Sequence, residues 1–186
     1  MSDTTRINVL GISGSLRKDS FNTATLRAAR ELAPGGMHVD MRTLEDIPLY
    51  NDDVRDRGYP EAVQALRNQI TKADAVLIVT PEYNYSIPGV LKNAIDWASR
   101  PPNQPFEGKP IAIMGASPGR LGSARAQYHL RQCFVFLNGL VLNRPEVMVA
   151  GAKSLFDASG RLTDEETRER IAKLLEALAG WVRRVT

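Results

Sequence analysis

The chain has 186 residues, of which 43% are hydrophobic and 24% are charged, and its formal net charge is +3. These values are ordinary for a folded domain and exclude disordered and fibrous proteins. The basic residues are spread along the chain rather than gathered in a run, so we expect no nucleic-acid binding. The N-terminus is polar and the apolar runs are short. We therefore expect one cytoplasmic domain over residues 1–186, without a signal peptide or a membrane span.

A single cysteine, Cys133, rules out an intramolecular disulfide and agrees with a reducing compartment. His129 precedes it by four residues on an expected helix, a spacing at which two metal ligands would share one face. The other histidine, His38, lies on a distant expected strand, so two further ligands are missing. We expect no metal site.

Apolar runs and helical patterns alternate along the whole chain. We expect strands at 7–12, 37–44, 75–80, 110–116 and 145–150, and helices at 22–32, 61–73, 88–99, 124–137 and 163–182. The runs at 75–80 and 110–116 are continuously apolar, as in central strands buried on both faces. Thr163 and Glu166 have the spacing of a capping box. The segment 46–60 is expected to be a long loop, a kind that often carries function or an interface.

Strands interleaved with helices predict an α/β fold with a doubly wound, five-stranded parallel sheet and helices on both faces. Among the common strand orders, 2-1-3-4-5 places the first and third strands side by side at the switch point. The loops that follow the first, third and fourth strands are the richest in polar and aromatic residues. We expect the functional site at the carboxyl edge of the sheet, where these loops meet.

The first of these loops joins an apolar strand to a helix through Ser13, Gly14, Ser15, Arg17 and Ser20. The free N–H groups of a helix's first turn attract anions, and small residues let a phosphate approach the backbone. The loop contains neither G-x-G-x-x-G nor G-x-x-x-x-G-K-[ST], and it has no cysteine nucleophile. It suits a terminal phosphate that is held rather than cleaved. A plain turn with a helix N-cap is the alternative.

The loop after the third strand carries a second motif, TPEYNYSIPGVLKNAIDW. Together with GSLRKDSFNT, the motif resembles the NADPH-dependent FMN reductase family, flavodoxin-like enzymes that include quinone and chromate reductases and some azoreductases. The resemblance implies that the turn, fixed by Pro81 and Pro88, offers its tyrosine rings and backbone groups to the flat face and pyrimidine edge of an isoalloxazine. A proline-braced loop with two surface tyrosines is the alternative. GASPGRLGSARAQ, residues 115–127, points toward the quinone and chromate reductase branch.

This resemblance implies an FMN-dependent NAD(P)H oxidoreductase that reduces quinones and other small acceptors, chromate and azo compounds among them, by ping-pong hydride transfer through bound FMN. NADPH or NADH would be the co-substrate. The residues implied to hold FMN are Ser13, Ser15, Arg17, Ser20, Asn22 and Thr23 at the phosphate, Pro81, Glu82, Tyr83, Asn84 and Tyr85 at the rings, and Ser117, Gly119 and Arg120 from the loop after the fourth strand. Arg120 is equally well explained as a solvated loop residue.

Hydride transfer through a flavin requires no side-chain acid or base, so a catalytic residue is not assigned. Arg125, Tyr128 and Glu146 are the weak candidates, and helix-surface or interface packing is their alternative role. Two other functions stay open: a reductase that releases reduced FMN to a partner, and a non-enzymatic electron carrier or redox-responsive binding protein. Flavodoxins that act as carriers tend to be strongly acidic, whereas this chain is basic, which favours the enzyme.

The resemblance also implies a homodimer or a dimer of dimers, which would be a homotetramer, with the flavin near the contact. The segment 51–57 would then cover the flavin of a neighbouring subunit. An apolar patch that includes Trp97, Phe134 and Phe136 would suit such a contact, and burial in the core explains the same residues equally well.

Overall fold

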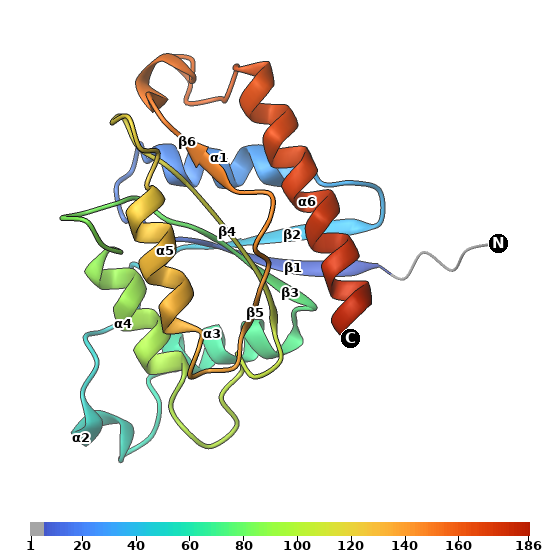
Figure 1. Cartoon of the computed structure of the whole chain (residues 1–186). Helices are drawn as coiled ribbons and strands as arrows, with labels where there is room; N and C mark the ends of the chain where they lie inside the picture. Colours follow the sequence, from blue (N-terminus) through green and yellow to red (C-terminus); the bar gives the residue numbers. More distant parts are fainter. Residues whose placement is uncertain (1–5) are drawn as a thin grey trace.

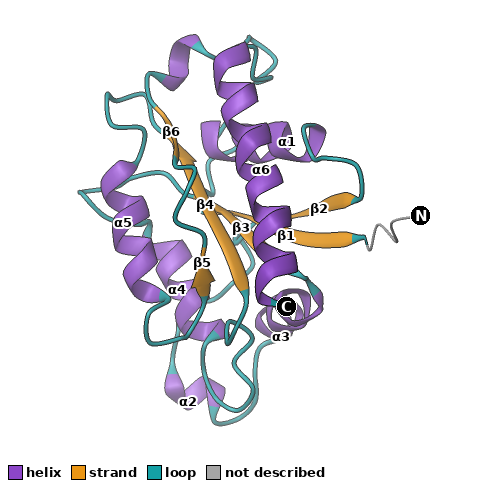
Figure 2. Ribbon diagram, turned by 45° about the vertical axis from the view of Figure 1, so that its right-hand side comes forward, coloured by secondary structure: helices purple, strands orange, loops and turns teal. Residues whose placement is uncertain are grey.

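The computed structural model describes residues 6–186, in which a parallel sheet lies between two layers of helices (Figures 1 and 2). The polar N-terminus on which the expectation of no signal peptide rests, residues 1–5, lies outside the described residues. The strands β1 (Ile7–Ser13), β2 (Met37–Arg42), β3 (Ala75–Val79) and β4 (Pro110–Ala116) lie in the order β2-β1-β3-β4, and all their pairings are parallel. The predicted flavodoxin-like order is confirmed.

Two helices cover one face of the sheet and three cover the other. The first pair is α1 (Phe21–Glu31) and α6 (Glu165–Val185), and the second set is α3 (Glu61–Lys72), α4 (Gly89–Ala98) and α5 (Ala124–Cys133). Every residue of β3 is buried, because alternate side chains enter the two cores. Leu77 packs on the side of α1 and α6, whereas Ile78 packs on the side of α3, α4 and α5. This explains the continuously apolar run at 75–80.

The far edge of the sheet differs from the prediction of a single strand at 145–150. β5 (Leu140–Val141) pairs with the start of β4, and β6 (Val147–Val149) pairs with its end, so the sheet has six strands. The predicted helix at 124–137 is also too long, since α5 ends at Cys133. The amide of Gly139 donates to the carbonyl of Phe134 over 3.1 Å, and this turn directs the chain into β5.

Smaller corrections concern the last helix and the long loop. α6 follows Asp164, whose carboxylate accepts a hydrogen bond from the amide of Thr167 over 2.9 Å. The predicted capping box at Thr163 is wrong, because the hydroxyl of Thr163 donates to the carbonyl of Leu155 instead. The loop at 46–60 contains a four-residue helix, α2 (Asp52–Arg55).

The expected apolar patch divides between the core and the surface. Trp97 and Phe134 are fully buried, as the alternative interpretation had it, while Phe136 is 95% exposed. Within residues 6–186, no helix is long and apolar enough to cross a membrane.

Candidate functional site

The loop after β1 is organised by bonds between its own hydroxyl groups and the start of α1. The buried hydroxyl of Ser13 lies 2.8 Å from that of Thr23. Ser20 is the N-cap of α1, and its hydroxyl oxygen accepts hydrogen bonds from the amides of Asn22 and Thr23 over 3.1 and 3.3 Å. The loop therefore presents a helix N-terminus together with a set of hydroxyl groups, the arrangement that attracts an anion.

Arg17 supplies this loop with a full positive charge. Its amide donates to the hydroxyl of Ser15, and its guanidinium lies 5.9 Å from the centroid of the Phe21 ring. Within residues 6–186, no carboxylate lies within 4.0 Å of this guanidinium, so it is free to pair with a ligand. Hydroxyls, amides and an uncommitted arginine fit a phosphate monoester, and none of them is an activated nucleophile.

Asn22 joins this loop to the one that follows β4. Its side-chain amide donates to the carbonyl of Ala116 over 2.9 Å, and its side-chain oxygen accepts from the amide of the same residue over 2.8 Å. This pair of buried bonds fixes the start of α1 against the end of β4. In the next loop, the hydroxyl of Ser117 accepts from the amide of Gly119 over 3.1 Å, and Arg120 is exposed.

The loop after β3 forms a two-residue hairpin at Tyr83–Ser86. Tyr83 and Ser86 exchange both backbone hydrogen bonds, over 3.0 and 2.9 Å. Asn84 and Tyr85, between them, have φ values of 48° and 66°, which is the left-handed pair of a type I′ turn. Such a conformation is unfavourable for a tyrosine, and non-glycine residues held in this way concentrate at functional sites. The rings of Tyr83 and Tyr85 are 53% and 68% exposed, so they are available to a ligand.

Helix α5 holds this hairpin from two positions one turn apart. The carboxylate of Glu82 pairs with the guanidinium of Arg125 and accepts from the amide of Ala126 over 3.1 Å. Burial raises the pKa of Glu82, but the hydrogen bonds from Arg125 and Ala126 outweigh it and hold the pKa below its usual range. At the other position, the hydroxyl of Ser86 lies 2.9 Å from Nδ1 of His129. The guanidinium carbon of Arg125 also lies 3.6 Å from the centroid of the Tyr85 ring, which fixes the hairpin tip.

Sequence reasoning missed these contacts between the hairpin and α5, because the hydrogen bonds join residues 43 or 44 positions apart. The sequence offers no local signal for them, because Ser123 at the start of α5 is a residue type that commonly caps a helix itself. In the structure, Ser123 makes no side-chain capping bond, and the carboxylate of Glu82 accepts from the amide of Ala126 instead.

The three weak catalytic candidates do not gather at one point. Arg125 is paired with Glu82. Tyr128 instead interacts with the nearby carboxylate of Glu146, which raises the pKa of the Tyr128 phenol. Tyr128 is 51% exposed, so this pair lies on the outer surface of α5.

His129 and Cys133 do lie on the same helix, but the thiol donates to the His129 carbonyl over 3.6 Å. In the part of the chain that the structure describes, no three His, Cys, Asp or Glu side chains are placed to hold a metal ion.

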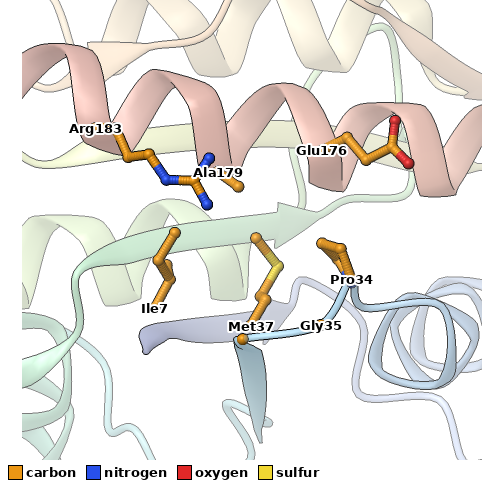
Figure 3. Close-up of a pocket in the computed structure, with 8 residues that line it drawn as sticks. Ile7, Pro34, Gly35, Met37, Glu176, Ala179 and Arg183 are labelled. Atoms are coloured by element: carbon orange, nitrogen blue, oxygen red, sulfur yellow. The ribbon is translucent and has the colours of Figure 1, made fainter. Parts of the chain in front are cut away.

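A separate hollow of about 160 Å³ lies at the opposite edge of the sheet, between α6 and the first residues of β1 and β2 (Figure 3). Glu176 and Arg183 of α6 lie on one side of it, and Ile7, Pro34 and Met37 lie on the other. Because it is at the amino ends of the strands, it is separated from the loops described above by the length of the sheet.

The fold and the anion-accepting loop define a class, the flavodoxin-like flavin-binding proteins. Comparison with known proteins narrows this class. The model of the NADPH-dependent FMN reductase family matches residues 7–154. The chain is similar to an NAD(P)H-dependent FMN reductase of Pseudomonas aeruginosa, with 60% identity over all of this chain and 99% of that one. It is 46% identical to a quinone reductase of Escherichia coli, over 97% of each chain.

Among solved structures, the chain is similar to FerB, a flavoenzyme NAD(P)H:(acceptor) oxidoreductase from Paracoccus denitrificans. The TM-score is 0.86 and the identity is 38%, with 96% of this chain and 98% of that one covered. The chain belongs to the NADPH-dependent FMN reductase family. It is an FMN-dependent enzyme that oxidises NAD(P)H.

Proposed function

We propose that this enzyme is a quinone reductase, in which NAD(P)H, a proton and a quinone yield NAD(P)⁺ and the quinol. The observation that carries the proposal is the placement of two unlike loops at one sheet edge. One presents free donors and a cation at the start of α1, and the other presents two exposed tyrosine rings on a braced hairpin. The Escherichia coli relative is a quinone reductase, which supports the choice of acceptor.

The residues fall into three groups in this proposal. The phosphate of FMN would be held by Ser13, Ser15, Arg17, Ser20, Asn22 and Thr23, the rings by Pro81, Glu82, Tyr83, Asn84 and Tyr85, and the edge nearest β4 by Ser117, Gly119 and Arg120. The side-chain amide of Asn22 is hydrogen-bonded to the backbone of Ala116, so this residue would position the turn rather than contact the phosphate. The carboxylate of Glu82 is bonded to α5, so this residue would contact the flavin through its backbone groups.

FMN supplies the hydride-accepting and hydride-donating chemistry when it is bound. The chain binds it, orients it and leaves one side open for nucleotide and quinone in turn, as a ping-pong reaction requires. Arg125 would be a positioning residue, acting through Glu82 and Tyr85. The Tyr128 phenol, whose pKa is raised by Glu146, stays protonated at neutral pH and would be the candidate of the three for a proton donor.

We extend the proposal to other acceptors, assembly and location. An open flavin face would also reduce chromate and azo compounds. The exposed apolar side chains of Val135 and Phe136, directly after α5, favour assembly into dimers or a homotetramer. The use of NAD(P)H and the lone thiol of Cys133 support a cytoplasmic location for a domain that spans residues 1–186.

The first test is spectroscopic. We expect the purified protein to be yellow, to release FMN on heating, and to oxidise NADPH in the presence of benzoquinone with parallel double-reciprocal plots. A colourless protein whose spectrum stays unchanged when FMN is added would contradict the proposal. Gel filtration during turnover separates the alternatives: flavin that stays with the protein supports a quinone reductase, while flavin that leaves it supports a reductase that delivers FMNH₂ to a partner. Turnover no faster than that of free FMN would favour a carrier.

A further inference from the structure

A basic groove lies beside the loop that follows β1. Most of the residues that line it were not predicted from the sequence to belong to a site. We propose that this groove binds the 2′-phosphorylated adenosine end of NADPH and so makes the enzyme prefer NADPH to NADH. The inference rests on the proposed oxidation of NAD(P)H and adds the part of the nucleotide that the chain recognises.

The groove runs between α1 and the segment 153–160, which precedes α6. Its cavity has a volume of about 400 Å³, within the range of roughly 300–1,000 Å³ typical of small-molecule sites. A second hollow of about 130 Å³ continues it along α1, and Arg27 lines both. The space is therefore large enough for part of a nucleotide.

Three cations line the groove: Arg17 and Arg27 from the side of α1, and Lys153 from the opposite side. Within residues 6–186, no carboxylate lies within 4.0 Å of any of the three charged groups. Half-buried Arg27 and exposed Lys153 have no place in the proposed FMN site. Uncommitted cations of this kind suit a phosphate dianion.

Two carboxylates, those of Asp19 and Asp157, also line the groove, and neither lies within 4.0 Å of the three cations. One oxygen of Asp157 accepts from the amide and the hydroxyl of Ser159 and from the amide of Arg161, over 2.9, 2.6 and 2.9 Å. It is directed into its own turn rather than toward the cations. Arg17 belongs to the proposed FMN phosphate site, so Arg27 and Lys153 are the two cations that remain for a second phosphate when FMN is bound.

Two phenylalanine rings form an apolar part of the same wall. The ring centroids of Phe21 and Phe156 lie 5.3 Å apart at an interplanar angle of 39°, and both residues are only half buried. A site for a bare phosphate has no use for such a surface, whereas a purine base stacks on aromatic rings. Rings and cations together favour a nucleotide that carries a phosphate near its base.

The place of the groove accords with this nucleotide. Arg17 and Ser20 line the groove and also belong to the proposed FMN phosphate site, so the two share a boundary at the carboxyl edge of the sheet. A dinucleotide at that edge would direct one end to the flavin and the other into the groove. NADH and NADPH differ only by the 2′-phosphate on the adenosine, so unpaired cations at that end would discriminate between them.

The test measures binding separately from turnover. FMN-saturated protein, in which the flavin phosphate site is filled, is titrated calorimetrically with 2′,5′-ADP and with 5′-AMP, which differ by the 2′-phosphate alone. We expect 2′,5′-ADP to bind about tenfold more tightly, and this preference to disappear in the double variant Arg27→Ala, Lys153→Ala. Arg30→Ala is the matched control, since Arg30 is exposed on the same helix and does not line the groove.

The steady-state constants provide the second measurement. In the double variant, KM for NADPH should rise about tenfold, while KM for NADH changes less than twofold and kcat and FMN content stay as in the wild type. Equal binding of 2′,5′-ADP and 5′-AMP by the wild type, or a preference that survives the double substitution, would overturn the inference. So would inorganic phosphate that competes as well as 2′,5′-ADP, because the groove would then be a plain anion site. A protein that oxidises neither NADH nor NADPH would refute the proposed function instead, and the calorimetric result would stand apart from it.

Discussion

The two loops of the candidate site are built in opposite ways. In the loop after β1, the bonds of Ser13 and Ser20 reach partners no more than ten residues away. In the hairpin after β3, Glu82 and Ser86 depend on Arg125 and His129, each 43 residues further along the chain. The hydroxyl groups of the first loop are therefore arranged by near neighbours, with Asn22 holding the start of α1 against Ala116, whereas the second loop is shaped by its fit against α5.

Because of this difference, a substitution in the first loop can weaken ligand binding without lowering stability, whereas a substitution in the hairpin should affect both. In the first loop, Arg17 takes no part in an ion pair with any residue of the described range 6–186, so its removal should leave the fold undisturbed. In the hairpin, the group that fixes the loop also caps a helix, so its removal should affect both the fold and the flavin. The expected effects below run from the largest to the smallest.

Glu82→Ala should cause the largest loss. It leaves Arg125 and the amide of Ala126 without their acceptor, so we expect the free energy of unfolding to fall by about 2 kcal/mol. The affinity for FMN should fall in the same variant, because the hairpin loses its brace. Urea unfolding and flavin fluorescence titration measure the two quantities. Asp96→Ala, which breaks an exposed i, i+4 pair with Lys92, is the control and should cost about 0.5 kcal/mol or less.

Arg17→Ala should weaken FMN binding about tenfold and leave the free energy of unfolding of the flavin-free protein nearly unchanged. The reason is that Arg17 is exposed, and within residues 6–186 its guanidinium forms no ion pair. Flavin fluorescence titration measures the dissociation constant, with Lys18→Ala as the neighbouring exposed control. Unaltered FMN affinity in Arg17→Ala would remove this arginine from the proposed phosphate site.

Ser20 affects both protein stability and FMN binding in the first loop, because its hydroxyl caps the start of α1. Ser20→Ala should lower the free energy of unfolding by about 1 kcal/mol and should also weaken FMN binding. Ser20→Asp restores a capping oxygen but adds a negative charge beside the expected phosphate. It should recover the stability and not the affinity. Recovery of both would show that Ser20 acts only as a cap.

The smallest expected effect is a pH dependence carried by Glu82. Its pKa in the folded protein is held below the ordinary value of 4.5, so its contribution to stability is complete above that value and is lost as the pH falls through the folded-state pKa. The difference in unfolding free energy between the wild type and Glu82→Gln should therefore be constant from pH 8 to about pH 5.5 and should shrink below about pH 4.5. Urea unfolding at a series of pH values measures it. A difference that grows toward acid pH would mean that the carboxylate is not stabilised by α5.

Patterns of neighbouring residues predicted most of the fold. A few consecutive residues were enough to predict the buried strand β3 and the polar start of α1, and the alternation of strands and helices predicted the strand order. The errors fall where the chain responds to distant partners. The strand expected at 145–150 is β6, and β5 is an additional strand that pairs with the start of β4, which the chain reaches because α5 stops at Cys133.

The sequence by itself determined the parallel sheet, the anion-accepting turn and the family, because these depend on burial periodicity, helix capping and motifs that are contiguous in the chain. Only the tertiary structure decided that Glu82 caps α5, that Asn22 binds the end of β4, and that Arg27 and Lys153 line one groove. The physical reason is that each of these contacts joins residues far apart in the chain, and only the folded packing brings such residues together.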